Sequence, residues 1–176
     1  MDTAHAQSKH PASPILAGPY GHPFHPILVT VPIGAWISSL VFDVASWLVA
    51  EPAALRQGST WLIGIGVVGA VAAAMVGTMD LFVIPTGTPA FRLGLVHMTL
   101  NLVVTVGFAA NFVWRQSSGD SGPVAAGMLA LSIVCIAVLA VSGYLGGKLA
   151  YHYGVRVADE TTQAAGFVKE STSSRG

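Results

Sequence analysis

Charge is what this sequence lacks most. Charged residues make up 9% of its 176 residues, whereas soluble domains contain about 25%. Eight basic residues balance eight acidic ones, so no basic surface for a nucleic acid is expected. The single cysteine, Cys135, lies in an apolar run, which excludes a disulfide framework or a cysteine metal cluster within one chain. The sequence also lacks a serine-nucleophile motif, a phosphate loop and an H-E-x-x-H motif, which disfavours a hydrolase or a kinase.

Apolar residues, in contrast, are abundant. They make up 53% of the chain, and the mean hydropathy is +0.66. Four apolar runs are each long enough to cross a hydrocarbon core of about 30 Å as a helix. The N-terminal segment is polar and has no apolar core, unlike a cleavable signal peptide. The sequence predicts an all-α integral membrane four-helix bundle in residues 21–154, with spans over about 26–50, 61–84, 90–114 and 123–153, and flexible cytoplasmic tails over 1–20 and 155–176.

The stretch GHPFHP, residues 21–26, stands at the start of the first span. Proline disfavours the α conformation in the residue before it, so His22 and His25 are expected to be extended. Pro26 is expected to be the first helical residue, and Pro32 is expected to kink the helix. The stretch thus predicts two imidazoles on a non-helical segment at the membrane surface.

Three further polar residues of the spans are candidates for a site. Asp80 lies near the end of the second span and is expected to point at a neighbouring helix. His97 lies about two turns inside the third span, where it is either a ligand or a hydrogen-bonded packing residue. His152 ends the fourth span, either as a site residue or as part of an aromatic and basic interface belt. The other members of that belt are Lys148, Tyr151 and Tyr153.

Asp43 is the one charge inside the first span. Helical spacing places it on the same face as Trp36 and His25. It lies about 27 Å from His25 along the helix axis, near the opposite membrane surface, so the two residues are not expected to share a compact site. Asp43 is either a functional carboxylate or a structural acceptor near that surface.

The basic residues are distributed unevenly over the two membrane sides. Four spans place both termini on one side, which holds six of the eight basic residues. The positive-inside rule therefore predicts cytoplasmic termini. On this side lie Lys9, Arg92, Lys148, Arg156, Lys169 and Arg175, and on the other lie Arg56 and Arg115. The candidate site residues converge on the cytoplasmic half: His22, His25, Asp80, Arg92, His97 and His152.

Three blocks of sequence resemble a known family. They are GHPFHPILVTVPIG, DLFVIPTGTPAFRLGLVH and SGYLGGKLAYHYGVRV, and they resemble the bacterial membrane-protein family known as domain of unknown function 2231 (DUF2231). The likeness covers about residues 20–157. It implies a four-helix protein of the bacterial inner membrane without an assigned activity. Members of the family also occur joined to Rieske-type iron–sulfur domains, which implies electron transfer, but this chain lacks the cysteines that such a domain requires.

The first functional hypothesis is haem b binding or an electron-transfer subunit. Haem b needs axial histidines from facing helices and a cation near its propionates. His25 or His22 would supply one axial ligand and His97 the other, with Arg92 or Lys148 near the propionates. Asp80 would orient an imidazole, and His152 would line the mouth together with Tyr151 and Tyr153. By helix rise, His97 is expected about 10 Å deeper than the histidines of residues 21–26.

Two alternatives remain. A Zn or Fe ion bound by His22, His25, His97 and Asp80 would be structural or transported. A cofactor-free subunit would use its small-residue ridges for assembly of a larger membrane complex or of a homo-oligomer. The expected partners are the lipid bilayer and other membrane redox subunits or an iron–sulfur protein. No residue points specifically to a quinone site.

Overall fold

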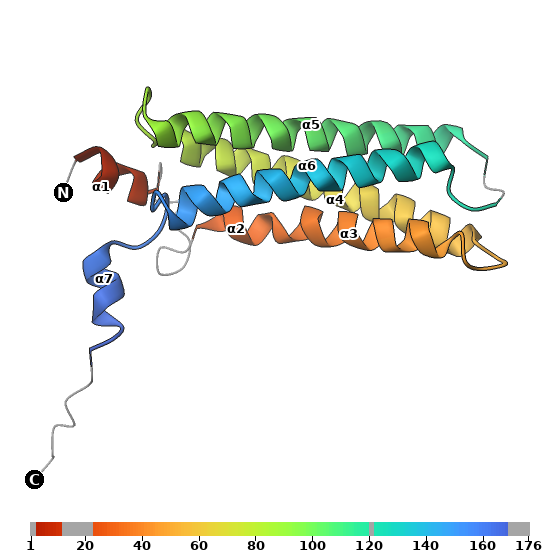
Figure 1. Ribbon diagram of the computed structural model, residues 1–176, viewed down its shortest axis with the longest axis horizontal. Coiled ribbons are helices and arrows are strands. Elements are labelled where there is room, and N and C mark those ends of the chain that lie inside the picture. The colour runs from red at the N-terminus through yellow and green to blue at the C-terminus, as the bar shows by residue number, and fades with distance from the viewer. Residues whose placement is uncertain (1–2, 12–22, 120–121, 169–176) are drawn as a thin grey trace, which may run out of the picture.

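The computed structural model describes residues 3–11, 23–119 and 122–168. In these residues the protein is all-helical, and four long helical spans lie side by side as a rod (Figure 1). The first span consists of α2 (Phe24–Leu28) and α3 (Thr30–Ala45). It is followed by α4 (Ala53–Phe82), α5 (Pro89–Ser117) and α6 (Ala126–Tyr151). All four spans are long and apolar enough to cross a membrane, which confirms the predicted membrane four-helix bundle.

The order of the helices around the bundle follows from their contacts. Helix α3 packs on α4, α4 on α5, α5 on α6, and α6 on α3. Helices α3 and α5 therefore face each other across one diagonal, and α4 and α6 across the other. At the centre, the Trp36 ring of α3 stacks on the Phe108 ring of α5 with a centroid distance of 4.3 Å. Both side chains are buried, so this stack forms the middle of the core.

The first span begins differently from the prediction. The helix starts at Phe24 rather than Pro26, and His25 is helical rather than extended. Pro26 is accommodated because the first turn of a helix needs no intrahelical N–H bond. The span is interrupted at Val29, between α2 and α3, one turn before Pro32. Since Pro32 has no N–H to offer the carbonyl of the preceding turn, this interruption is the local distortion expected from that proline.

Helices α4 and α5 extend beyond their predicted limits, whereas the first span ends at Ala45 rather than residue 50 and α6 lies within the predicted range 123–153. Helix α4 starts at Ala53 rather than Trp61, because the sequence AALRQ consists of strong helix formers that continue the helix beyond the apolar run. Helix α5 starts close to its predicted position, where the Thr88 hydroxyl accepts a bond from the Phe91 N–H. It ends at Ser117 rather than residue 114, and this extension places Arg115 inside a helix instead of a loop.

The tails, predicted to be flexible, contain short helices in their described parts. Helices α1 (Thr3–Lys9) and α7 (Glu160–Ala165) lie at the same end of the bundle (Figure 1). The Lys9 ammonium pairs with the Glu160 carboxylate at 3.0 Å, and the Arg156 N–H donates to the Ser8 carbonyl at 3.0 Å. The two tails therefore contact each other at this end.

We expect the stack across the bundle centre to dominate core stability. Replacing Phe108 by Ala opens a cavity beside Trp36 and should lower the free energy of unfolding by about 3 kcal/mol or more. Unfolding in mixed detergent micelles, followed by circular dichroism, measures this loss. Phe82→Ala is the matched control, because that ring is 74% exposed, and its effect should stay below about 1 kcal/mol. Equal losses for the two variants would contradict the assigned core.

Candidate functional site

Two histidines from diagonal spans meet inside one end of the bundle. His25 of α2 and His97 of α5 have ring centroids 6.4 Å apart, and their planes are nearly perpendicular at 83°. The prediction that His97 lies about 10 Å deeper is wrong. It assumed that all helices begin at one level, whereas His25 is the second residue of α2 and His97 lies two turns inside α5. Helix α5 therefore starts farther out along the bundle, and the two imidazoles lie at similar depth.

Helix α4 fixes the imidazole of His25. Its Nδ1 lies 2.9 Å from the Ala73 carbonyl oxygen. One turn farther on, Gly77 leaves space for the ring, because a Cβ at that position would lie 2.8 Å from the Cε1 and Nδ1 atoms of His25. A carbonyl oxygen only accepts hydrogen bonds, so Nδ1 is the protonated nitrogen. In a neutral imidazole the Nε2 atom then carries the lone pair, which is the usual state of a metal-binding histidine.

Helix α6 fixes the imidazole of His97 in the same way. Nδ1 lies 2.8 Å from the Ser142 carbonyl oxygen, and a Cβ on Gly146 would lie 2.9 Å from Cε1 of the ring. The Asn101 amide nitrogen lies 3.1 Å from Nε2. Because this amide nitrogen only donates, Nε2 must accept, which agrees with a proton on Nδ1. Both histidines thus present the same tautomer, each held by a carbonyl of an adjacent helix.

Asp80 lies near this pair but has another main partner. Its carboxylate, on α4, forms an ion pair with the Arg156 guanidinium, with 2.9 Å between Oδ1 and Nε. Asp80 lies about one helical turn beyond Gly77, the glycine on which the His25 ring packs. The Nδ1 atoms of the two histidines, however, donate to backbone carbonyls, so the predicted orienting role belongs to Ala73 and Ser142.

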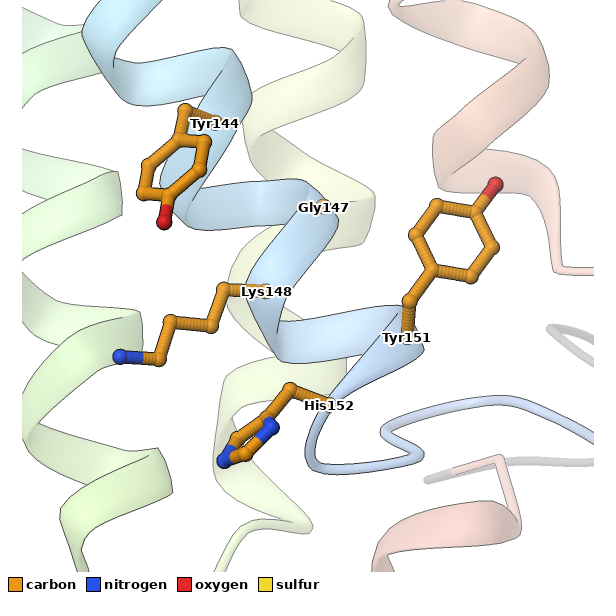
Figure 2. Close-up of a pocket in the computed structure, with 5 residues that line it drawn as sticks. All are labelled: Tyr144, Gly147, Lys148, Tyr151 and His152. Atoms are coloured by element: carbon orange, nitrogen blue, oxygen red, sulfur yellow. The ribbon is translucent and has the colours of Figure 1, made fainter.

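The other predicted site residues are not brought to the histidine pair. Arg92 is exposed in the first turn of α5. His152 is exposed at the end of α6, where its ring contacts Tyr153 edge to face at 4.8 Å. It lines an open pocket of about 460 Å³ around the last turns of α6 (Figure 2). The rest of that pocket is lined by Tyr144, Gly147, Lys148 and Tyr151. His22 lies outside the described residues.

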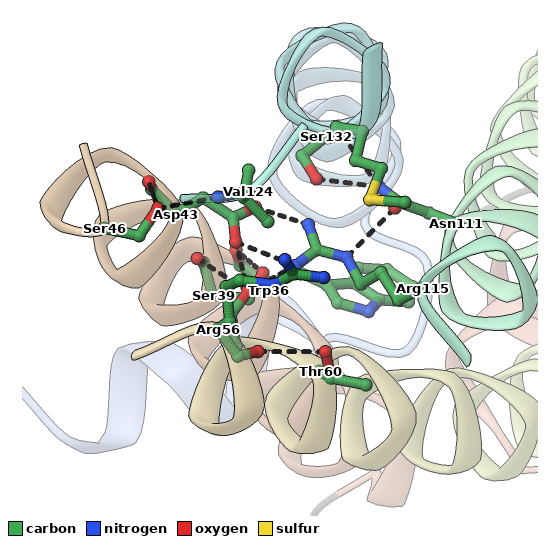
Figure 3. Close-up of polar contacts among 12 residues, drawn as sticks. Trp36, Ser39, Asp43, Ser46, Arg56, Thr60, Asn111, Arg115, Val124 and Ser132 are labelled. Carbon is green, nitrogen blue, oxygen red and sulfur yellow. Dashed lines mark hydrogen bonds and ion pairs between the residues drawn. The ribbon is translucent and has the colours of Figure 1, made fainter. Parts of the chain in front are cut away.

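The opposite end of the bundle contains a buried ion pair that the sequence prediction missed (Figure 3). The two terminal nitrogens of Arg115 donate to the Asp43 carboxylate at 2.9 and 2.6 Å. Their side chains are 2% and 0% exposed. The Ser59 hydroxyl donates to the same carboxylate, and Nε of Arg115 donates to the Asn111 side-chain oxygen. Of the two roles left open for Asp43, the geometry supports the structural acceptor.

One signal in the sequence could have identified this pair. Asp43 and Arg115 are charges of opposite sign, and each stands near the end of an apolar run that leads to the same membrane surface. Two such charges neutralise each other most readily when they meet inside the bundle. The assignment of Arg115 to a loop hid this relation, because a loop arginine needs no buried partner.

Comparison with known proteins identifies a family. A family described as "Predicted membrane protein (DUF2231)" matches residues 21–159. No curated protein and no solved structure matches the chain.

The glycines beside the histidines provide a test of the site geometry. Gly146→Ala should unfold more easily than Gly143→Ala by about 2 kcal/mol, because the added methyl group overpacks against His97. The control residue lies on the same helix, and a Cβ there would meet nothing within 4 Å. Both variants gain similar helix propensity, so the difference isolates the contact with His97. Equal unfolding free energies in detergent would contradict the position of the His97 ring.

Proposed function

Since the chain belongs to the DUF2231 family of predicted membrane proteins, we propose that it binds haem b between His25 and His97 as an electron-transfer subunit of a membrane redox complex. The observation that carries this proposal is the meeting of two imidazoles from diagonal spans, with a centroid distance of 6.4 Å. The expected electron-transfer partners are other membrane redox subunits or an iron–sulfur protein.

The spacing of the rings would let both imidazoles hold one metal ion. Two imidazoles that bind the same ion from different sides, with metal–nitrogen distances of about 2 Å, would have centroids roughly 6 Å apart. Each ring is also held by a hydrogen bond from its Nδ1 atom to a carbonyl. Such a bond fixes the ring orientation and makes Nε2 a better ligand. The proposal therefore assigns His25 and His97 as the residues that would hold the haem iron, and the Asn101 amide would have to release Nε2 of His97 for this role.

The number of protein ligands favours haem over a simple ion. A haem iron takes its equatorial ligands from the porphyrin and needs at most two from the protein. A Zn or Fe ion commonly takes three or more protein ligands. Across the described ranges, no group of three or more His, Cys, Asp and Glu residues is arranged to hold a metal ion.

The charges of the bundle support the proposed orientation, with the termini in the cytoplasm of a bacterium and the histidine pair in the cytoplasmic half of its inner membrane. Ion pairs occur on both sides, since Arg115 pairs with Asp43 on one side and Lys9 and Arg156 pair with carboxylates on the other. They leave the bias of basic residues toward the termini as the sequence gives it, because the rule counts basic residues rather than net charge. Arg92 is exposed in the first turn of α5, near the histidine end, where its guanidinium would pair well with a propionate.

The absorption spectrum of the purified protein tests the proposal. The detergent-solubilised protein should show a Soret band and, after reduction, sharp α and β bands. His25→Ala and His97→Ala should each abolish the bands of the six-coordinate haem, because each removes one axial ligand. His152→Ala is the matched control, since that ring is exposed elsewhere on α6, and its spectrum should match the wild type.

Other outcomes would replace the proposal. A colourless protein that contains one equivalent of Zn or Fe by elemental analysis would establish the metal-ion alternative. A colourless, metal-free protein that co-purifies with other membrane subunits would establish the assembly role. Bands that persist in both axial variants would show that any haem binds elsewhere.

A further inference from the structure

The two halves of the membrane domain repeat each other. Three residues on α5 follow their counterparts in the first span by 72 residues. The pairs are His25 and His97, Trp36 and Phe108, and Asp43 and Arg115. Four of the five buried residues of α3 have a buried counterpart in α5, 72 positions later. The exception is Ala35, whose counterpart Gly107 is half-buried. The four pairs are Pro32 and Val104, Trp36 and Phe108, Ser39 and Asn111, and Asp43 and Arg115.

The second helix of each half shows the same correspondence with a spacing of 69 residues. Every buried residue of α6 has a buried counterpart in α4. The four pairs are Ser59 and Met128, Ile63 and Ser132, Gly66 and Cys135, and Ala73 and Ser142. The change in spacing means that the connection within the first hairpin is three residues longer than the connection within the second.

The contacts inside the two hairpins also correspond. His25 bonds the Ala73 carbonyl and packs on Gly77, while His97 bonds the Ser142 carbonyl and packs on Gly146. Near the opposite end, the Ser59 hydroxyl, whose proton goes to Asp43, lies 3.1 Å from the Ser39 carbonyl oxygen, and Asn111 donates to the Met128 carbonyl. These two contacts join equivalent pairs of positions, although the side chain comes from the second helix in one hairpin and from the first helix in the other.

The relation between the hairpins is a parallel repeat. Helices α3 and α5 occupy one diagonal and run in the same direction, as do α4 and α6 on the other (Figure 1). A two-fold rotation about the bundle axis exchanges the hairpins, as in parallel repeats related by an axis along the membrane normal. His25 and His97 meet on this axis near one end, Trp36 and Phe108 at the centre, and Asp43 and Arg115 near the other end.

We propose that the protein is an internal pseudo-dimer of two equivalent helical hairpins, in which Asp43 and Arg115 are positioning residues that align the halves so that His25 and His97 meet. Equal charges at these equivalent positions would repel each other inside the bundle, whereas unlike charges form a bidentate pair that fixes the rotation and the height of one hairpin against the other. This alignment is independent of any cofactor.

A charge exchange tests the equivalence of the two positions. Asp43→Arg and Arg115→Asp should each lower the folding equilibrium constant by about a hundredfold or more, because each leaves like charges buried together. The double variant D43R/R115D should recover at least tenfold over either single variant, because the two-fold rotation brings the exchanged charges together again. The readout is unfolding of the full chain in detergent. Glu51→Arg is the matched control at the same end, since Glu51 is exposed, and it should behave like the wild type.

A second measurement separates alignment from stability alone. Nitroxide labels at Thr30→Cys and Leu102→Cys, in a Cys135→Ser background, occupy equivalent exposed positions on the two diagonal spans. Double electron–electron resonance should give a narrow distance distribution with the native pair and with the exchanged pair. It should give a broader or shifted one in Asp43→Leu/Arg115→Leu, which retains the packed volume without the charges.

Each result decides one part of the proposal. A charge exchange that recovers nothing over the single variants would overturn the equivalence of the two positions. A leucine pair that keeps the narrow distribution would overturn the positioning role. Neither measurement depends on haem, so the absence of a haem spectrum would leave this inference standing.

Discussion

The buried ion pair between Asp43 and Arg115 constrains the whole bundle. Each charge would be very costly in hydrocarbon without a partner. The pair is satisfied by all four spans: α3 supplies the carboxylate, α4 the Ser59 hydroxyl, α5 the guanidinium and the Asn111 side chain, and α6 the Ser132 hydroxyl and the Met128 carbonyl that hold Asn111. No pair of helices can provide this arrangement alone. The charges therefore disfavour every arrangement except the complete bundle.

At the histidine end the buried polar groups are neutral imidazoles, and they also need hydrogen-bond partners from other helices. A neutral imidazole buried in a membrane still needs a partner for its N–H, and each histidine finds it on the carbonyl of an adjacent helix. Glycine is required next to each ring, because a Cβ there would approach the imidazole to less than 3 Å. The small-residue ridges of α4 and α6 thus serve two purposes, since they allow close helix packing and make room for side chains on the bundle axis.

Hydropathy was sufficient to predict the four spans, because a chain without water around it must form helices of membrane length. Helix ends were harder to predict. The apolar run ends at Trp114, but the helix continues through Arg115, since a charge that has a buried partner need not leave the helix. Such partners depend on tertiary contacts that a single span does not reveal.

The candidate site was predicted in part. The sequence pattern predicted that His25 and His97 lie in the same half of the membrane domain. In the structure their rings lie edge to face, with centroids 6.4 Å apart. Their common depth was missed, because it depends on how far α5 extends beyond α2. The internal repeat was missed for a similar reason. Its signal is a constant spacing of buried positions, whereas the residues at those positions mostly differ, as at Ser59 and Met128.

The differences between the two hairpins indicate what each end of the axis requires. At one end the equivalent residues are Asp43 and Arg115, because two identical charges cannot share a buried site. At the centre they are the aromatic rings of Trp36 and Phe108, which need only shape and area to stack. At the other end, both residues are histidine, and both histidines pack on glycine. Packing alone does not require identical imidazoles on a two-fold axis, since Trp36 and Phe108 pack well without being identical. A ligand that takes one nitrogen donor from each side would account for this identity, and the haem of the proposed function would be such a ligand.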